Sequence, residues 1–318
     1  MRFYEFRKWF FDIARGSDDY IILFLTRIKL GRNYRIYFQM HGSKRDPGQS
    51  FTPYISCIRS LRQKGSDDRV LLFYEGDIRF DNSNCSIKLE FEEFKVNLLY
   101  SSDKIFWPEN SVYYDKKKNG TIEWKPLIPG GNVSGSINTR DGLKTFIDAR
   151  GYCDEVISTI LPWKVPVSQL YWGRTNNAKI NISYSFMRDR NSIHETSRLY
   201  LNAAGRVYIL DGFTFKIIQY RKSTSMDLIF ADRYIIQGTS GDLMITIEVS
   251  DHEEMIINDF MDYRNEYGKV ATSLIRWISR NPHGIKFSAE ANIDIRILNE
   301  TYRLERERFV DEYVEFQL

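Results

Sequence analysis

Apolar and polar residues alternate one by one along several segments of the chain. A period of two places every second side chain on the same face of a β-strand. The alternating segments are 34–41, 85–92, 94–100, 180–186, 243–249 and 285–291. Turn-forming residues separate such segments, as at 31–33, 81–84, 141–142 and 238–241. Many short strands with tight turns between them predict an antiparallel β-sandwich or β-barrel.

Two segments are candidates for short helices. Residues 252–264 combine acidic and apolar residues without a period of two. Residues 271–280 end just before Asn281 and Pro282, a typical signal for the end of a helix. A regular succession of strands and helices is absent from the sequence, which argues against a parallel α/β fold. The prediction is an all-β protein with few short helices.

The chain has 318 residues, which is long for one domain and comfortable for two. Two prolines, Pro162 and Pro166, fall within the segment 161–167, and prolines so close together interrupt a strand ladder and suit a connection. We therefore expect two domains, 1–165 and 166–318. Each has about the length of one eight-stranded lipocalin barrel.

Charge and composition narrow the classes of partner. The 45 basic and 42 acidic residues give a net charge of +3, which is no electrostatic signature for nucleic acid. The basic run 116–118 precedes Asn119-Gly120, a strong hairpin signal, so we predict a hairpin tip there and no nucleic-acid partner. Aromatic residues make up 15% of the chain and suit both β-sheet cores and pockets for apolar ligands.

Cofactor and metal sites have no sequence support. The three cysteines and four histidines are scattered, without the spacing of a zinc site or a disulfide framework. Phosphate-binding loops, dinucleotide fingerprints and serine-nucleophile elbows are absent. We therefore expect neither metal nor organic cofactor. The sequence shows neither a signal peptide nor an apolar segment of membrane-spanning length, so we expect a cytoplasmic protein without stable membrane insertion.

Several short motifs occur in a characteristic order. They are Lys-Trp-Phe-Phe-Asp at 8–12, Gly-Tyr-Cys-Asp-Glu at 151–155, Tyr-Trp-Gly-Arg at 171–174 and Glu-Tyr-Val-Glu at 312–315. In this order they resemble the carotenoid 1,2-hydratase (hydroxyneurosporene synthase) superfamily, which is related to fungal Diels–Alder cyclases. The resemblance spans nearly the whole chain. It implies two tandem lipocalin-like antiparallel β-barrels and an apolar small molecule as ligand.

The motif at 151–155 supplies the candidate catalytic residues. The family has Gly-Tyr-His-Asp-His at this place, so Cys153 and Glu155 stand here where the resemblance has histidines. Asp154 is the candidate general acid, because a buried carboxylic acid can protonate carbon. Tyr152 shares its face of the strand, whereas the residues on either side of Asp154 do not. The alternative for Asp154 is a structural carboxylate that accepts hydrogen bonds from a strand end or pairs with Arg174.

Three further residues are candidates for ligand binding. Trp172 and Arg174 belong to the Tyr-Trp-Gly-Arg motif, and Trp9 belongs to the opening motif. The structural alternatives are barrel wall for Trp172 and an ion pair for Arg174.

Three functions fit these residues. The first is a binding protein for an apolar lipid, isoprenoid or polyketide-like molecule, which the loss of both motif histidines favours. The second is a cofactor-free hydratase, isomerase or cyclase that uses Asp154. The third is an interaction protein whose barrels are filled with side chains. The sequence contains no indication of the oligomeric state.

Overall fold

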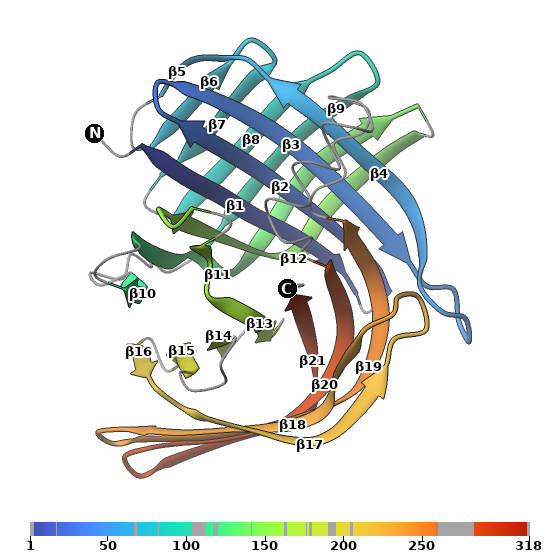
Figure 1. Ribbon diagram of the computed structural model, residues 1–318. Coiled ribbons are helices and arrows are strands. Elements are labelled where there is room, and N and C mark those ends of the chain that lie inside the picture. The colour runs from blue at the N-terminus through green and yellow to red at the C-terminus, as the bar shows by residue number, and fades with distance from the viewer. Residues whose placement is uncertain are drawn as a thin grey trace. The chain divides into compact units, whose positions relative to one another are not determined.

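Most of the residues described by the computed structural model form antiparallel strands (Figure 1). The model describes residues 3–16, 18–66, 69–81, 83–102, 112–116, 120–140, 142–161, 164–175, 177, 180–189, 195–203, 206–259 and 283–316. No α-helix occurs among these residues. The strands belong to two separate sheets. The all-β prediction is therefore confirmed.

The first sheet has twelve strands in the order β4-β3-β2-β1-β12-β11-β9-β8-β7-β6-β5, with β10 paired to β11. Its strands are β1 (Tyr4–Arg15), β2 (Asp19–Leu30), β3 (Asn33–Lys44), β4 (Thr52–Leu61), β5 (Gln63–Ser66), β6 (Val70–Phe73), β7 (Gly76–Phe80), β8 (Asn84–Glu90), β9 (Phe94–Ser101), β10 (Val112–Lys116), β11 (Gly120–Thr139) and β12 (Gly142–Ser158).

The second sheet has nine strands in the order β16-β15-β14-β13-β21-β20-β19-β18-β17. Its strands are β13 (Val167–Thr175), β14 (Asn181–Asp189), β15 (Glu195–Ala203), β16 (Arg206–Asp211), β17 (Thr214–Lys222), β18 (Ile229–Ser240), β19 (Leu243–Asp259), β20 (His283–Ile297) and β21 (Glu300–Glu315).

The chain connections show that both sheets curl back on themselves. The two edges of the first sheet, β4 and β5, are consecutive in the chain and separated by Arg62 alone. The two edges of the second sheet, β16 and β17, are separated by Gly212 and Phe213 alone. In each sheet the first strand pairs with the last long strand, β1 with β12 and β13 with β21. Edges so close along the chain can meet only if the sheet bends into a barrel-like wall.

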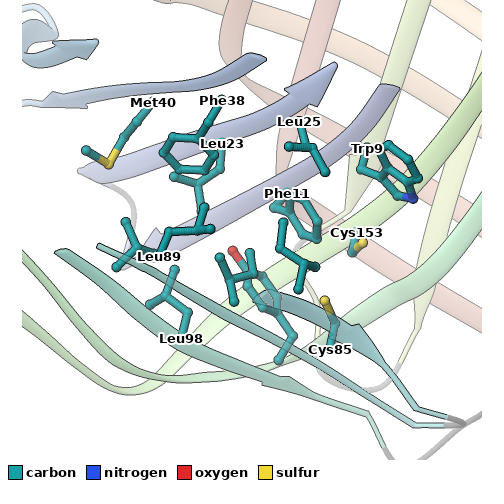
Figure 2. Packing of buried hydrophobic residues seen from close by; sticks show 14 of the residues in the cluster. Trp9, Phe11, Leu23, Leu25, Phe38, Met40, Cys85, Leu89, Leu98 and Cys153 are labelled. Carbon is teal, nitrogen blue, oxygen red and sulfur yellow. The ribbon is translucent and has the colours of Figure 1, made fainter. Parts of the chain in front are cut away.

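Each sheet encloses its own apolar core. Figure 2 shows the first one, in which side chains of β1, β2, β3, β8, β9 and β12 converge. The second core is rich in buried aromatic rings, contributed among others by Tyr171, Phe186, Phe215 and Phe287. The chain accordingly forms two compact units, the first made of 1–43 and 54–161 and the second of 44–53 and 162–318. The domains 1–165 and 166–318 stay a prediction.

The expected helices need a correction. Residues 252–259 of the segment 252–264 belong to the strand β19, so a helix that starts at 252 is wrong. A bulge in β19 between Ser250 and Glu253 interrupts the alternation, and that interruption hid the strand in the sequence. The predicted helix 271–280 lies outside the described residues. Over the described ranges, no helix is long and apolar enough to cross a membrane.

Candidate functional site

Tyr152 and Asp154, the two candidate catalytic residues, lie side by side on β12 and hydrogen-bond to each other. The Tyr152 hydroxyl donates to Asp154 Oδ2 at 2.9 Å. The indole Nε1 of Trp124, on the neighbouring strand β11, donates to the same oxygen at 2.9 Å. All three side chains are buried, and Asp154 is only 3% exposed. We call these three residues the Asp154 cluster.

Aromatic rings surround the cluster. Phe10 on β1 is the register partner of Asp154, and its ring centroid lies 6.0 Å from that of Tyr152. The ring of Phe24, on β2, lies 5.5 Å beyond Phe10. Charged groups lie there as well: Lys8 Nζ stands 3.9 Å from the Phe24 ring centroid, and the buried Asp12 is the register partner of Tyr152.

The hydrogen bonds orient the carboxyl group. Two donors from two strands converge on Oδ2 and use both of its lone pairs. In the acid form the proton is therefore carried by Oδ1. A carboxyl held in one orientation can give this proton to a reacting atom and take one back afterwards.

Cys153 and Glu155 point to the opposite side of β12. Cys153 lies in the first core beside Cys85 (Figure 2). Burial is the main cause that raises the pKa of its thiol well above the usual value, and the hydrogen bond with Cys85 is the next. Glu155 pairs with Arg7, whose Nε lies 2.7 Å from Oε1. Burial raises the pKa of Glu155, and the positive charge of Arg7 opposes that rise. The two replaced positions of the motif therefore do not contribute to the Asp154 cluster.

Gly151, the first residue of the motif, is required by close packing. A Cβ atom at this position would lie 2.3 Å from Val133 Cγ2 and 2.8 Å from the carbonyl oxygen of Asp12. The neighbouring strands β1 and β11 thus approach β12 too closely for any side chain just before Tyr152.

We expect Gly151→Ala to lower the free energy of unfolding by about 1–3 kcal/mol, the usual range for an overpacked core. Gly65→Ala is the matched control, because its Cβ would meet nothing closer than Leu72 Cδ1 at 4.0 Å. Denaturant unfolding of both variants measures the difference. Equal stability of the two variants would show that β1 and β11 can move away from β12 without lowering the free energy of unfolding.

Trp9 lies on the other face of β1 from Phe10. Its side chain belongs to the first core together with Cys153 (Figure 2). The Arg7 guanidinium stands 5.1 Å from its ring centroid. The structure therefore separates Trp9 from the Asp154 cluster, and a role in binding ligand stays a prediction.

Trp172 and Arg174 lie on β13, in the second sheet, and both are buried. Their side chains point away from the second core, which Tyr171 enters from the same strand. Arg174 Nη1 donates to the carbonyl oxygen of Thr175 at 2.9 Å. These residues are not members of the Asp154 cluster.

A buried ion pair lies against Trp172. Lys286 Nζ stands 5.2 Å from the Trp172 ring centroid and donates to a carboxylate oxygen of Glu312. Lys286 on β20, Glu312 on β21 and Trp172 on β13 are register partners across three adjacent strands. The Lys286 side chain has no exposure and that of Glu312 has 11%. Sequence reasoning missed this pair, because nothing in the sequence aligns the three strands.

A second group of polar residues lies in the core of the second unit. Asp311 accepts from the hydroxyls of Tyr184 at 2.8 Å and Tyr234 at 2.7 Å, and His252 Nε2 lies 2.7 Å from its Oδ2. The two tyrosine hydroxyls also contact each other. All four residues are at least 97% buried. We call them the Asp311 cluster. Tyrosines at core-facing positions were its only trace in the sequence, since a buried phenol needs a partner.

Metal ligands do not gather in the described part of the chain: no group of three or more His, Cys, Asp or Glu side chains there is suited to hold an ion.

Solved structures with the same fold place the chain among known proteins, although no protein-family model matches the sequence. An AttH-like protein from Nitrosomonas europaea has a TM-score of 0.61 and 10% identity, covering 99% of this chain and 93% of that chain. CghA with Sch210972 has a TM-score of 0.60 and 10% identity, covering 99% and 89%. The chain has the fold of these proteins. Kievitone hydratase from Nectria haematococca, at TM-score 0.56 and 11% identity, covers 98% and 89%.

The likeness extends over both units of the chain. The tandem lipocalin-like fold, which the short motifs implied by resemblance to the carotenoid 1,2-hydratase superfamily, is therefore confirmed. At 10–11% identity the neighbours establish the fold alone. The chemistry has to be argued from the side chains of this chain.

Proposed function

We propose that the chain is a cofactor-free enzyme that binds an apolar small molecule and transfers a proton to it from Asp154. The observation that carries the proposal is the convergence of Trp124 and Tyr152 on one oxygen of a buried carboxyl. A buried carboxylate that has no catalytic role also needs hydrogen bonds, so a second observation is required. The second support is that the motif residues which differ from the resemblance face away from this cluster, so their change leaves it complete.

Hydration is the reaction we favour. The Oδ1 proton of Asp154 goes to one carbon of an isolated alkene, and the electron pair of the double bond forms the new C–H bond. A water molecule then bonds to the other carbon and releases its extra proton to the Asp154 carboxylate, which restores the acid. One water is added in total. A hydratase among the proteins of the same fold is consistent with this choice.

Isomerisation uses the same first step. If the cation loses a proton from a neighbouring carbon instead of gaining water, the double bond moves and the carboxylate again recovers its proton. The ring of Phe10 suits such a cation, because the faces of aromatic rings attract positive charge; the Lys8 ammonium already stands 3.9 Å from the Phe24 ring centroid. Binding of an apolar molecule is common to all these reactions and to a protein that only carries its ligand.

Deuterium distinguishes the enzyme from the carrier. The ligand is first identified by native mass spectrometry of the protein purified from its own host. The compound is then incubated with the protein in D2O, with the compound alone and with heat-denatured protein as controls. The proposal predicts a product with one carbon-bound deuterium, because the acid proton of Asp154 exchanges with solvent. Return of the unlabelled compound identifies a carrier, and a cyclised product without deuterium rules out the acid role.

A further inference from the structure

One face of β1 carries a basic residue at one end and an acidic residue at the other. Lys8, Phe10 and Asp12 share this face, because every second side chain of a strand points the same way. Trp9 and Phe11 point to the opposite face and enter the first core (Figure 2). Lys8 and Asp12 are separated by about 13 Å along the strand. The face is therefore polar at both ends and apolar between them.

The register of three adjacent strands places this face against the Asp154 cluster. Phe10 pairs with Phe24 on β2 and with Asp154 on β12. Asp12 pairs with Tyr152 on β12. Phe10 thus lies between Phe24 and Asp154, which are separated by two strand spacings, or about 10 Å.

The ammonium group of Lys8 lies over the ring of Phe24. Its Nζ is 3.9 Å from the ring centroid. Phe24 is 1% exposed, although it is not a member of the first core. Thr26, the register partner of Lys8, is buried as well. The ammonium therefore stands over a buried part of the sheet, on the far side of Phe10 from Asp154.

An ammonium group at this place can bind an oxygen atom of a ligand. Lysine has three N–H donors, so Lys8 can donate to a ligand in addition to the contacts that it makes within the protein. A hydrogen bond from an ammonium to an oxyanion is about twice as strong as one between neutral groups. The low polarity of the buried surroundings strengthens the attraction further. This end of the face therefore selects an oxyanion.

Asp12 gives the ligand a direction. Its side chain has no exposure and stands beside Tyr152, at the end of the face opposite Lys8. An ionised carboxyl group can only accept hydrogen bonds, and it repels an oxyanion. The anionic end of a ligand is therefore excluded from the row of Asp12 and lies towards Lys8.

We propose that the ligand of the Asp154 cluster is an apolar acid, whose carboxylate is bound by Lys8 while its double bond lies at Asp154. The place of the double bond rests on the proposed function. The two strand spacings between Phe24 and Asp154 put the carboxylate about 10 Å from the reacting carbon. The ring of Phe10 lies against the apolar part of the ligand between these two points. A hydrocarbon without an oxyanion is a weaker ligand.

Parinaric acid and its methyl ester test the proposal, because these fluorescent polyenes share one apolar chain and differ in the carboxylate. Fluorescence titration of the full chain near neutral pH measures both dissociation constants. We expect the acid to bind about 10–100-fold more tightly than the ester, the effect of one hydrogen bond between charged groups. Equal affinity for the two probes, or binding of neither, overturns the proposal.

Substitutions of Lys8 locate the preference for the acid. Lys8→Met keeps an unbranched apolar side chain without the charge, so affinity for the acid should fall about 10–100-fold. Affinity for the ester should change little, which also shows that the variant is folded. Lys8→Arg retains a positive charge and should keep the preference.

Lys125→Met is the matched control. Lys125 on β11 pairs in register with Glu155, so it lies with Glu155 on the opposite face of the sheet. Its loss removes the same charge from the same sheet and should leave both affinities unchanged. An equal fall in Lys125→Met and Lys8→Met, or no fall in Lys8→Met, overturns the assignment to Lys8.

Asp154→Asn separates this inference from the proposed function. Binding of the carboxylate does not need the proton of Asp154, so the variant should keep the preference for the acid over the ester. If deuterium transfer fails in the wild type while the preference is present, the carboxylate site stands and only the enzyme is ruled out. If deuterium is transferred while the preference is absent, only the role of Lys8 is overturned.

Discussion

Asp154→Asn is expected to lower turnover of the bound molecule by about 10²–10⁴-fold, the range that general acids contribute. The amide oxygen of asparagine can accept from Trp124 and Tyr152 as Oδ2 does, so the cluster keeps its shape. The amide cannot give a proton to carbon, so the chemical step is lost. Affinity for the ligand should change little, because the apolar surroundings remain.

Glu155→Gln is the matched control for this substitution. It lies next to Asp154 on β12, carries the same carboxyl group, and faces the opposite side, where it pairs with Arg7. Turnover of this variant should stay within a few-fold of wild type. Single-turnover kinetics of both variants, with ligand affinity measured separately, give the comparison.

The structural alternative for Asp154 makes a different forecast. If the carboxylate serves only to satisfy Trp124 and Tyr152, Asp154→Asn leaves turnover unchanged and lowers the free energy of unfolding by roughly 1–3 kcal/mol, the cost of an imperfectly paired buried group. A variant that alters neither turnover, ligand affinity nor stability would leave the motif at 151–155 without functional weight.

Alternation in the sequence assigned the buried face in strands that are buried on one side only. Along β8 and β9 the predicted apolar residues from Cys85 to Leu89 and from Phe94 to Tyr100 are buried, while Phe91, which the pattern also included, is partly buried. The rule also predicted that Tyr152 and Asp154 share a face while Cys153 and Glu155 share the other. It could not tell which face meets the core, because β1, β2 and β12 carry buried residues on both faces.

Hydrogen-bond partners that come from other strands could not be predicted from the sequence. Trp124 reaches Asp154 only because the pairing of β11 with β12 shifts its register at three places, between Pro126 and Ile128, between Ile128 and Gly131, and between Val133 and Gly135. Each shift changes which side chains lie opposite each other, and no local pattern records it. The bulge that turns His252 into the second core hid the Asp311 cluster for the same reason.

Glu312→Gln is expected to lower the free energy of unfolding by about 3–5 kcal/mol, the usual effect of removing one partner of a buried ion pair. The Lys286 side chain has no exposure, so after this change its ammonium loses its carboxylate partner without gaining water. The ring of Trp172, 5.2 Å from Nζ, offers only a weaker attraction than the carboxylate does.

A second substitution separates charge from packing. In the double variant Lys286→Met/Glu312→Gln the buried ammonium is gone, and methionine fills a similar volume, so most of the lost stability should return. Urea unfolding of the wild type, both single variants and the double variant completes the cycle. If the double variant is as unstable as the sum of the single variants, the pair contributes through packing alone. Recovery would instead show that the buried ammonium without its carboxylate partner, and not a loss of packing, causes the instability of Glu312→Gln.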